Sequence, residues 1–464
     1  MTPRLLRRGG RDTRPSPTAF DRRLIAPMVL GSVLNPVNSS MIAVALVPIG
    51  AAFGAPPAET AWLVSALYLA TALGQPVAGR LVDMYGPRRL YLIGTALVGV
   101  AGLAGALAPS LGVLIAARVL LGFGTSAAYP AAMRLTRDES ARTGRDSPAG
   151  VLATLAVANQ TVAAIGPALG GLLIGAGGWH LVFTVNVPLA AACLVLGARR
   201  LPRTPPAAGP RGVDLPGMAL FAVTLVSLMT FLMRPQADRW YLPLVCAVAA
   251  CAFAVRERRV PDPFVDVRVL AGNLPLLATY LRQLLGYTTA YAFLYGFPQW
   301  LEQGRGLGSS TAGLVLLPLS GAALAASALT GRREAVRTKL VVGSLLQMTG
   351  CAALLLLGSG TPLWLLLVVG AVMGVPQGLI GLATQNALYR QADPQRIGSA
   401  AGLLRTFSYL GALASSVATA AFYPHHADTA GLHGLALFML AGSALLLATT
   451  LPDRSLARLT PRKA

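Results

Sequence analysis

A chain of 464 residues would make about three soluble domains, but it is 55% hydrophobic and only 12% charged, far below the roughly 25% charge of soluble proteins. This composition excludes a soluble protein. The formal net charge is +21, yet the basic residues stand in short clusters between long apolar runs, as in membrane proteins and unlike a nucleic-acid-binding patch. The two lysines, Lys339 and Lys463, do not follow glycine, so there is no Gly-Lys-Ser/Thr phosphate loop and ATP-driven pumping by this chain is excluded.

Apolar blocks that are long enough to cross a bilayer follow one another along the chain. A helix crosses the hydrocarbon in about 20 residues, and fourteen such blocks are separated by Arg, Pro or Gly. The predicted spans are 24–53, 60–82, 90–108, 111–134, 150–176, 180–198, 215–234, 240–256, 273–298, 310–331, 338–358, 362–389, 397–423 and 431–451. The predicted fold class is therefore an all-α integral membrane protein with 14 transmembrane helices.

Basic residues are unevenly distributed between the two sets of loops. Of the 38 basic residues, 32 lie in the two tails and in the loops that follow even-numbered spans, whereas the other loops hold only Arg234, Arg239 and Arg305. Lys and Arg accumulate on the cytoplasmic side of a membrane. We therefore predict a multi-pass protein of the cell (inner or plasma) membrane with both termini in the cytoplasm.

The predicted spans divide into two six-helix halves and an inserted pair. The expected parts are a basic cytoplasmic tail (1–23), an N-terminal six-helix bundle (24–198), linkers with two inserted helices (199–272), a C-terminal six-helix bundle (273–451) and a cytoplasmic tail (452–464). A weak internal repeat supports pseudo-symmetry, since Gly-Val-Leu-Ala-Thr opens span five and Gly-Leu-Leu-Arg-Thr lies near the start of span thirteen. Repeated halves with a site at their interface are typical of secondary transporters.

The loop between spans two and three carries a recognisable motif. It reads Gly79-Arg-Leu-Val-Asp83-Met-Tyr-Gly86-Pro-Arg88-Arg89, which resembles the signature Gly-x-x-x-Asp-(Arg/Lys)-x-Gly-(Arg/Lys)-(Arg/Lys) of the major facilitator superfamily, with Met in place of one basic residue. Physically, Gly79 allows close helix approach and Gly86 permits a tight turn. The resemblance implies a cytoplasmic latch that holds the outward-facing state, formed by Gly79, Asp83, Gly86, Arg88 and Arg89.

Two later segments also resemble signatures of this family. Arg118 in span four is followed by two glycines, like the family's buried arginine, and either faces a water-filled cavity or forms a hydrogen-bonding hub. Span five resembles the antiporter signature that accompanies export, with Val162 in place of its leading glycine, and contains Gly166, Pro167, Gly170 and Gly171. Proline with flanking glycine bends a helix, which suits a hinge.

Residues 179–188 resemble a segment of the fourteen-span drug/proton antiporter branch of the family, but the first span departs from that branch. Where the branch usually has an aspartate, this chain has Asn38, and no span has an acid in its middle. The charged residues within the spans are Arg118, Arg282 and Arg405. The sequence therefore predicts neutral or anionic substrates in preference to cations. A proton, if it is used, would have to bind Asp83, a helix-end acid or the substrate itself.

Polar side chains within the spans are the candidate cavity groups. In span nine a polar-aromatic face recurs every four residues, although such a stripe is more often helix packing than a substrate surface. Its members are Gln283, Tyr287, Tyr291 and Tyr295. The remaining candidates are Asn35, Asn38, Gln75, Asn159, Gln160, Gln377, Gln385 and Asn386.

These features favour a secondary active transporter that exports drugs or natural products by alternating access with proton coupling. The alternatives are uptake or facilitated diffusion of a metabolite, and a transport-dead membrane sensor. An enzyme is least favoured, because the spans hold no Asp/Glu cluster and no arrangement of metal ligands or nucleophiles. The expected partners are a small-molecule substrate, protons and lipid, with no nucleic acid, metal or cofactor, and the chain is expected to be a monomer.

Overall fold

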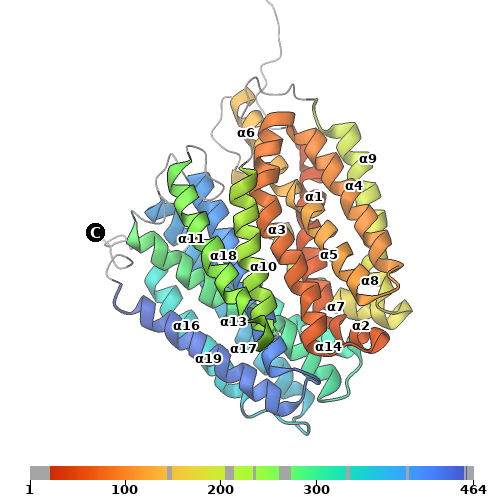
Figure 1. Cartoon of the computed structure of the whole chain (residues 1–464), viewed down its shortest axis with the longest axis vertical. Helices are drawn as coiled ribbons and strands as arrows, with labels where there is room; N and C mark the ends of the chain where they lie inside the picture. Colours follow the sequence, from red (N-terminus) through yellow and green to blue (C-terminus); the bar gives the residue numbers. More distant parts are fainter. Residues whose placement is uncertain are drawn as a thin grey trace, which may run out of the picture.

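The computed structural model describes residues 21–143, 149–203, 214–233, 237–260, 273–330, 335–392, 397–453 and 456. Within these ranges all regular structure is helical (Figure 1). The helices are η1(Arg22–Leu24), α1(Ile25–Met41), η2(Ile42–Val44), α2(Leu46–Phe53), α3(Pro57–Tyr85), α4(Pro87–Ala106), α5(Leu111–Ser126), α6(Ala128–Thr143), α7(Ala149–Gly177), α8(His180–Thr184), α9(Asn186–Arg200), α10(Leu215–Met233), η3(Ala237–Arg239), α11(Tyr241–Arg259), α13(Leu274–Gln303), α14(Ser309–Val315), α15(Leu317–Thr330), α16(Val336–Leu354), α17(Leu363–Gln391), α18(Ile397–Phe422) and α19(Thr429–Thr450).

Ten helical segments of the described chain are long and apolar enough to cross a membrane, judged by length and composition alone. This finding supports a multi-pass membrane protein, whereas the number of fourteen spans and the symmetry of the halves remain predictions. The helices α11, α13, α16 and α18 are not among the ten. Among them, α13 and α18 pack on each other, and α18 also packs on α3, so both can carry polar groups that face protein instead of lipid.

Four predicted spans are interrupted by proline. Breaks in the helix occur after Val44, Ser126, Thr184 and Val315. A proline follows each break within four residues, at Pro48, Pro130, Pro188 and Pro318. Proline has no N–H and its ring clashes with the carbonyl four residues earlier, which lies in the last turn before every break. The prolines at 36, 167, 298 and 376 lie inside uninterrupted helices instead.

The helices form two groups that meet along a seam. In the first group α1 packs on α7, α3 on α5 and α4 on α9, whereas in the second α13 packs on α18, α15 on α17 and α16 on α19. The groups meet where α3 contacts α18 and where α7 contacts α14 and α15. We call this interface the seam.

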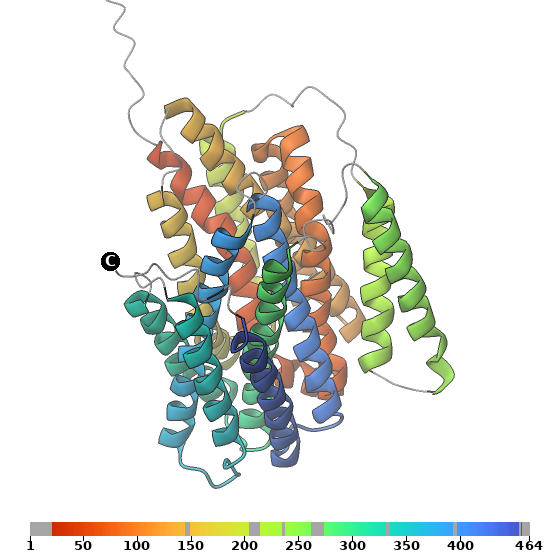
Figure 2. The same ribbon diagram turned by 90° about the vertical axis from the view of Figure 1, so that its left-hand side faces the viewer.

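The hairpin of α10 and α11 lies on the outside of the bundle, as Figure 2 shows, and α10 touches α3 and α18. An ion pair closes its open end, because Arg256 Nη2 lies 2.8 Å from Asp214 Oδ1.

The bundle has two ends. One end holds the junction between α3 and α4, the last turn of α6 and the last turn of α9 (Figure 1), and is here called the tail end. The connections that contain Gly54, Gly178 and Gly306, all with positive φ, lie at the opposite end, here called the loop end.

Candidate functional site

A hydrogen-bonded pair of tyrosines joins the two groups at the seam. The hydroxyls of Tyr68 on α3 and Tyr295 on α13 are 2.9 Å apart, and each residue is only 1% exposed. Tyr295 donates its proton to the backbone oxygen of Ser39 at 2.9 Å, so Tyr68 is the donor to Tyr295. These bonds connect α1, α3 and α13, and they must break if the seam is to open here.

Further aromatic rings surround this pair. The rings of Tyr291 and Tyr295 stack at 5.8 Å with an interplanar angle of 6°, and the Tyr68 ring lies 5.2 Å from Tyr291 and 5.7 Å from Tyr409. Gln75 Nε2 donates to the Tyr409 hydroxyl at 3.0 Å, again from α3 to α18. We define the tyrosine cluster as Tyr68, Tyr287, Tyr291, Tyr295 and Tyr409.

Sequence reasoning found the part of this cluster on α13 but missed Tyr68 and Tyr409. A signal existed for both. Tyr68 precedes Gln75 by seven residues, and Tyr409 follows Arg405 by four. Each tyrosine therefore lies on the same helix face as a residue that the sequence had already indicated as a candidate.

Arg405 supplies a positive charge beside the tyrosine cluster. Its guanidinium carbon lies 4.2 Å from the centre of the Tyr129 ring, a cation–π contact between α18 and α6 across the seam. It also interacts electrostatically with Tyr287 and Tyr409. Within the described ranges Arg405 makes no ion pair.

Arg118 acts as a hydrogen-bonding hub within the first group. Its Nε donates to the Leu63 backbone oxygen at 2.9 Å and its Nη1 to the Asn38 backbone oxygen at 3.1 Å. The side chain is 1% exposed, and its Nη2 has no partner among the described atoms. Of the two roles left open by the sequence, the structure favours the hub, since both bonds fix α5 to α1 and α3.

Asn38, which replaces the branch's aspartate, packs inside the first group. Its side-chain amide makes a reciprocal pair with that of Asn186 on α9, at 2.6 Å and 2.8 Å, and both residues are at most 1% exposed. Its amide is therefore fully used in helix packing in this conformation, and it does not belong to the tyrosine cluster.

Arg282 forms an ion pair that links two helices of the second group. This residue is buried, but its Nη2 forms an ion pair with Asp453 Oδ2 at 2.6 Å and donates to the Thr449 backbone oxygen at 2.6 Å. It therefore ties α13 to the end of α19. Asp453 lies 171 residues away in the sequence, so this pairing could not be predicted from the sequence.

Other polar candidates serve packing or lie apart from the tyrosine cluster. Gln283 Nε2 donates to Ser408 at 2.8 Å and its oxygen accepts from Thr384 at 2.5 Å, and Asn35 donates to Thr125 at 3.1 Å. Gln160 and Gln385 are exposed, and the half-buried remainder comprises Asn159, Gln377 and Asn386. In the described part of the chain, none of these last five is hydrogen-bonded to the tyrosine cluster.

At the loop end, glycines of the antiporter motif create the contact between α7 and α14. A Cβ atom at Gly171 would lie 2.5 Å from the backbone oxygen of Ser309, and one at Gly313 would lie 2.5 Å from that of Pro167. Ser310 Oγ donates to the Gly171 backbone oxygen at 2.8 Å. Backbones can therefore approach this closely only without side chains. We call this the α7–α14 contact.

The other two motif glycines face the first group. A Cβ atom at Gly166 would collide with the Ser40 side chain, and one at Gly170 would lie 2.8 Å from the Met41 backbone oxygen. The motif thus packs α7 on α1 as well as on α14, and α7 remains one helix through Pro167.

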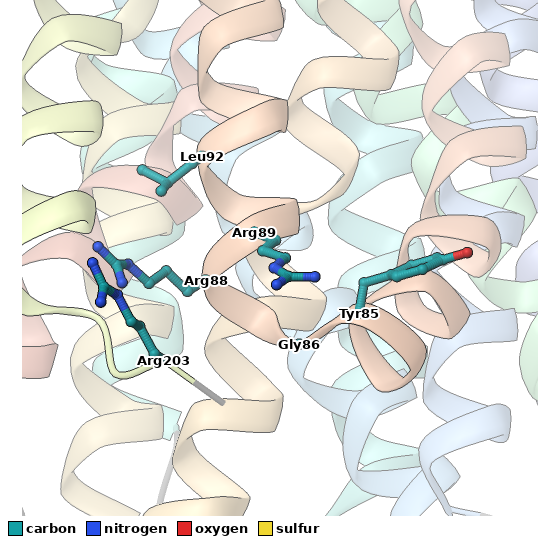
Figure 3. A pocket seen from close by; sticks show the side chains of 6 residues that line it. All are labelled: Tyr85, Gly86, Arg88, Arg89, Leu92 and Arg203. Atoms are coloured by element: carbon teal, nitrogen blue, oxygen red, sulfur yellow. The ribbon is translucent and has the colours of Figure 1, made fainter. Parts of the chain in front are cut away.

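At the tail end, three arginines line a pocket of about 210 Å³ (Figure 3). Arg88 and Arg203 lie close together on one side, and Arg89 points towards Tyr85. The other lining residues are Gly86 and Leu92. Arg88 Nη2 donates to the Ala198 backbone oxygen at 2.7 Å, which fixes α4 to α9. The three arginines make the pocket strongly basic.

Two glycines of the latch motif behave differently from each other. Gly86 has φ 88° and ψ 151°, a conformation open to glycine, as the motif predicts. At Gly79, however, no described atom lies within 4 Å of an added Cβ, so the expected close helix approach is absent in this conformation. The side chain of Asp83 lies outside the described part of the structure.

Similarity to known proteins identifies the family of this architecture. The model of the Major Facilitator Superfamily matches residues 28–416. The chain belongs to the Major Facilitator Superfamily. Among its relatives, the uncharacterized MFS-type transporter YwoD of Bacillus subtilis is 32% identical over 90% of this chain and 94% of its own length. The tetracenomycin C resistance and export protein of Streptomyces glaucescens is 27% identical over 86% and 74%, respectively.

A solved structure from a study of proton-dependent oligopeptide transporters has the same fold. It covers 94% of this chain and 98% of its own, with a TM-score of 0.67 and 13% identity. As a member of this family the protein is a transporter of small molecules rather than an enzyme, and its apolar helices make it a multi-pass membrane protein.

Proposed function

We propose that this MFS transporter exports neutral or anionic small organic molecules in exchange for protons, as a member of the fourteen-span drug/proton antiporter branch. In this proposal the protein lies in the cell membrane with both termini in the cytoplasm. The tail end is then cytoplasmic and the loop end extracellular. The antiporter motif at the α7–α14 contact supports export, as does the similarity to the tetracenomycin C exporter.

The observation that carries the substrate class is the charge of Arg405, which lies beside the tyrosine cluster and has no ion-pair partner among the described residues. Aromatic rings favour planar, apolar ligands through stacking, and a guanidinium favours carboxylate, phenolate or phosphate groups. Among the described residues that contact Arg405 or the tyrosine cluster there is no acid. A lipophilic cation would therefore meet a positive charge without a compensating carboxylate.

Transport would proceed by alternating opening of the seam at the two ends. Each hydrogen bond across the seam is individually weak, since a neutral hydrogen bond contributes about 0.5–1.5 kcal/mol net. A proton that moves down a potential of 100 mV releases about 2.3 kcal/mol. The free energy released by one proton is therefore of the same order as the net contribution of a few such hydrogen bonds.

Export from proteoliposomes under an imposed pH gradient tests the proposal. An aromatic carboxylate, a neutral aromatic compound and an ethidium-like cation are compared side by side. We expect proton-driven export of the first two and little export of the cation. Robust proton-driven export of the cation alone would contradict the proposed substrate class.

Asn38→Asp provides a second comparison in the same assay. The new carboxylate would lie within the packed pair with Asn186 and next to Arg118, away from the tyrosine cluster. We therefore expect little gain in cation export. If Asn38→Asp creates such export, the missing acid is the determinant of specificity and Arg405 is not.

A further inference from the structure

Glu302 is a shielded carboxyl at the loop end of the seam. It stands in the last turn of α13, beyond the predicted span 273–298. Its Oε2 accepts a hydrogen bond from Ser309 Oγ at 2.6 Å, whereas its Oε1 is buried without a partner in the described part of the structure. An ionised carboxylate with one oxygen left unsolvated is costly, so this position favours the protonated form.

No nearby cation offsets that cost. Arg305 follows on the same chain segment, but its guanidinium donates to the backbone oxygens of Gly358 and Thr361. The described part of α14 and of the loop-end half of α7 holds no charged side chain. Among the described residues, the other titratable groups of this end are Glu59, His180, Asp238, Arg239, Tyr241, Tyr423, His425, His426, Asp428 and His433. Burial raises the pKa of Glu302 to about 8, and the Ser309 bond opposes that rise.

Two of these other groups have hydrogen-bond partners of their own. Asp428 Oδ1 accepts from the Gly431 backbone N–H at 2.7 Å and so caps α19, and His433 Nε2 lies 2.9 Å from the Leu357 backbone oxygen. Burial and the hydrogen bond from Ser309 are the two causes that shift the pKa of Glu302. Its protonation therefore depends on how far it is shielded from water.

Glu302 is directly linked to the α7–α14 contact. Its partner Ser309 is the first residue of α14, and the backbone oxygen of Ser309 is the atom that a Cβ at Gly171 would strike. The next residue, Ser310, donates to the Gly171 backbone oxygen. Separation of α14 from α7 would move Ser309 and admit water to the carboxyl.

We propose that Glu302 is a proton-binding site of the loop-end gate, and that its protonation stabilises the closed α7–α14 contact. The proposal rests on the alternating-access part of the proposed function. It identifies a residue for the helix-end acid, which is one of the three proton carriers that the sequence leaves open, and it concerns gate closure whether or not that proton crosses the membrane.

The sign of the pH effect follows from linkage. In the closed conformation the pKa of Glu302 is about 8, whereas an open, hydrated carboxyl returns towards its ordinary value of about 4.3. Between these values the closed form binds more protons, so closure is favoured as pH falls and is lost as pH rises through about 8. Each unit of difference in pKa changes the ratio of closed to open protein tenfold.

Distance measurements between spin labels at the loop end test this gate. The labels are placed by Leu172→Cys on α7 and Leu314→Cys on α14, both of them exposed, after replacement of the four native cysteines. In lipid nanodiscs, without substrate, we expect the long-distance population to grow as pH rises from about 6 to about 10, with a midpoint near the pKa of Glu302.

Three variants isolate the carboxyl. Glu302→Gln, which can still accept the Ser309 bond, should stay closed throughout the titration. Ser309→Ala removes the donor that stabilises the carboxylate, so its midpoint should shift to higher pH. Asp238→Asn changes an exposed carboxylate in the α10–α11 connection at the same end and should behave as wild type.

Two results would overturn the proposal: a wild-type protein whose label distances do not change with pH, or a Glu302→Gln protein that keeps the wild-type response. If Glu302→Gln fails to fold, an unshifted midpoint in Ser309→Ala overturns it equally. Because no substrate is present, failure of the export assay leaves this result unaffected. Conversely, if proton-driven export persists unchanged in Glu302→Gln, the coupling of export to protons is separate from the control of the gate by Glu302.

Discussion

Arg405 has two neighbours of different kinds, the Tyr129 ring beneath its guanidinium and the tyrosine cluster beside it. Arg405→Gln removes the charge and keeps a polar side chain. A hydrogen bond to a charged group contributes about 1.5–3 kcal/mol, so we expect KM for an aromatic carboxylate to rise about ten- to hundredfold. KM for a neutral analogue should change little.

Arg259→Gln is the matched control for this substitution, because Arg259 is an exposed arginine in the last turn of α11, away from the seam. Transport kinetics in proteoliposomes provide the measurement. Equal losses for the carboxylate and its neutral analogue in Arg405→Gln would argue that Arg405 only holds α18 to α6.

The amide pair of Asn38 and Asn186 is predicted to contribute to stability rather than to substrate binding. Asn186→Ala leaves the buried Asn38 amide without its partner, which costs about 1–3 kcal/mol. The double variant with Asn38→Ala should cost clearly less than the sum of the two single changes. Thermal unfolding of the purified protein measures this. Additive losses would show that the two amides do not interact.

At the residue scale, the sequence predicted the tyrosine face of α13 and the position of Arg405, but not their partners. The four-residue period places side chains on one face of a helix, yet it does not say which helix packs there. Asp453 for Arg282 and Asn186 for Asn38 lie 171 and 148 residues away in the chain. Such pairs are determined by tertiary packing, which a single sequence does not display.

Among the elements, the predicted spans correspond closely to helices, and the interior breaks are the main difference. Each break precedes a proline, so the signal was present in the sequence. The same residue type did not break α7 at Pro167 or α13 at Pro298. Proline alone therefore does not determine where a helix ends, because neighbouring helices can hold its free carbonyl in place.

The α7–α14 contact makes a prediction about element packing. Gly171→Ala places a Cβ 2.5 Å from the Ser309 backbone oxygen, and overpacking of this kind costs about 1–3 kcal/mol. The loop end should then close less completely, and transport should fall while the amount of protein in the membrane is kept.

Gly321→Ala in α15 is the control, since an added Cβ there meets no described atom within 4 Å. The spin-label pair on α7 and α14 reports closure directly. A Gly171→Ala protein with wild-type distances and wild-type transport would contradict a role for close backbone approach at this contact.

For the whole molecule, the prediction is a topology with both termini in the cytoplasm. It rests on the 32 basic residues of one set of loops and tails against three in the other. Single cysteines on a Cys-free background should react with an impermeant reagent in intact cells when placed beside Glu302, and should be protected when placed beside Arg142. Labelling beside Arg142 from outside would invert the assignment of the two ends.

The ion pair between Asp214 and Arg256 at the open end of the α10–α11 hairpin has a consequence for how such a chain can vary. In the predicted topology both ends of the hairpin lie on one side of the membrane, so the chain crosses the membrane an even number of times within it. A pair of helices can therefore be added or lost between the halves without reversing the orientation of α13 to α19 in the membrane. A single extra helix would reverse the orientation of that half in the membrane and place Glu302 on the cytoplasmic side.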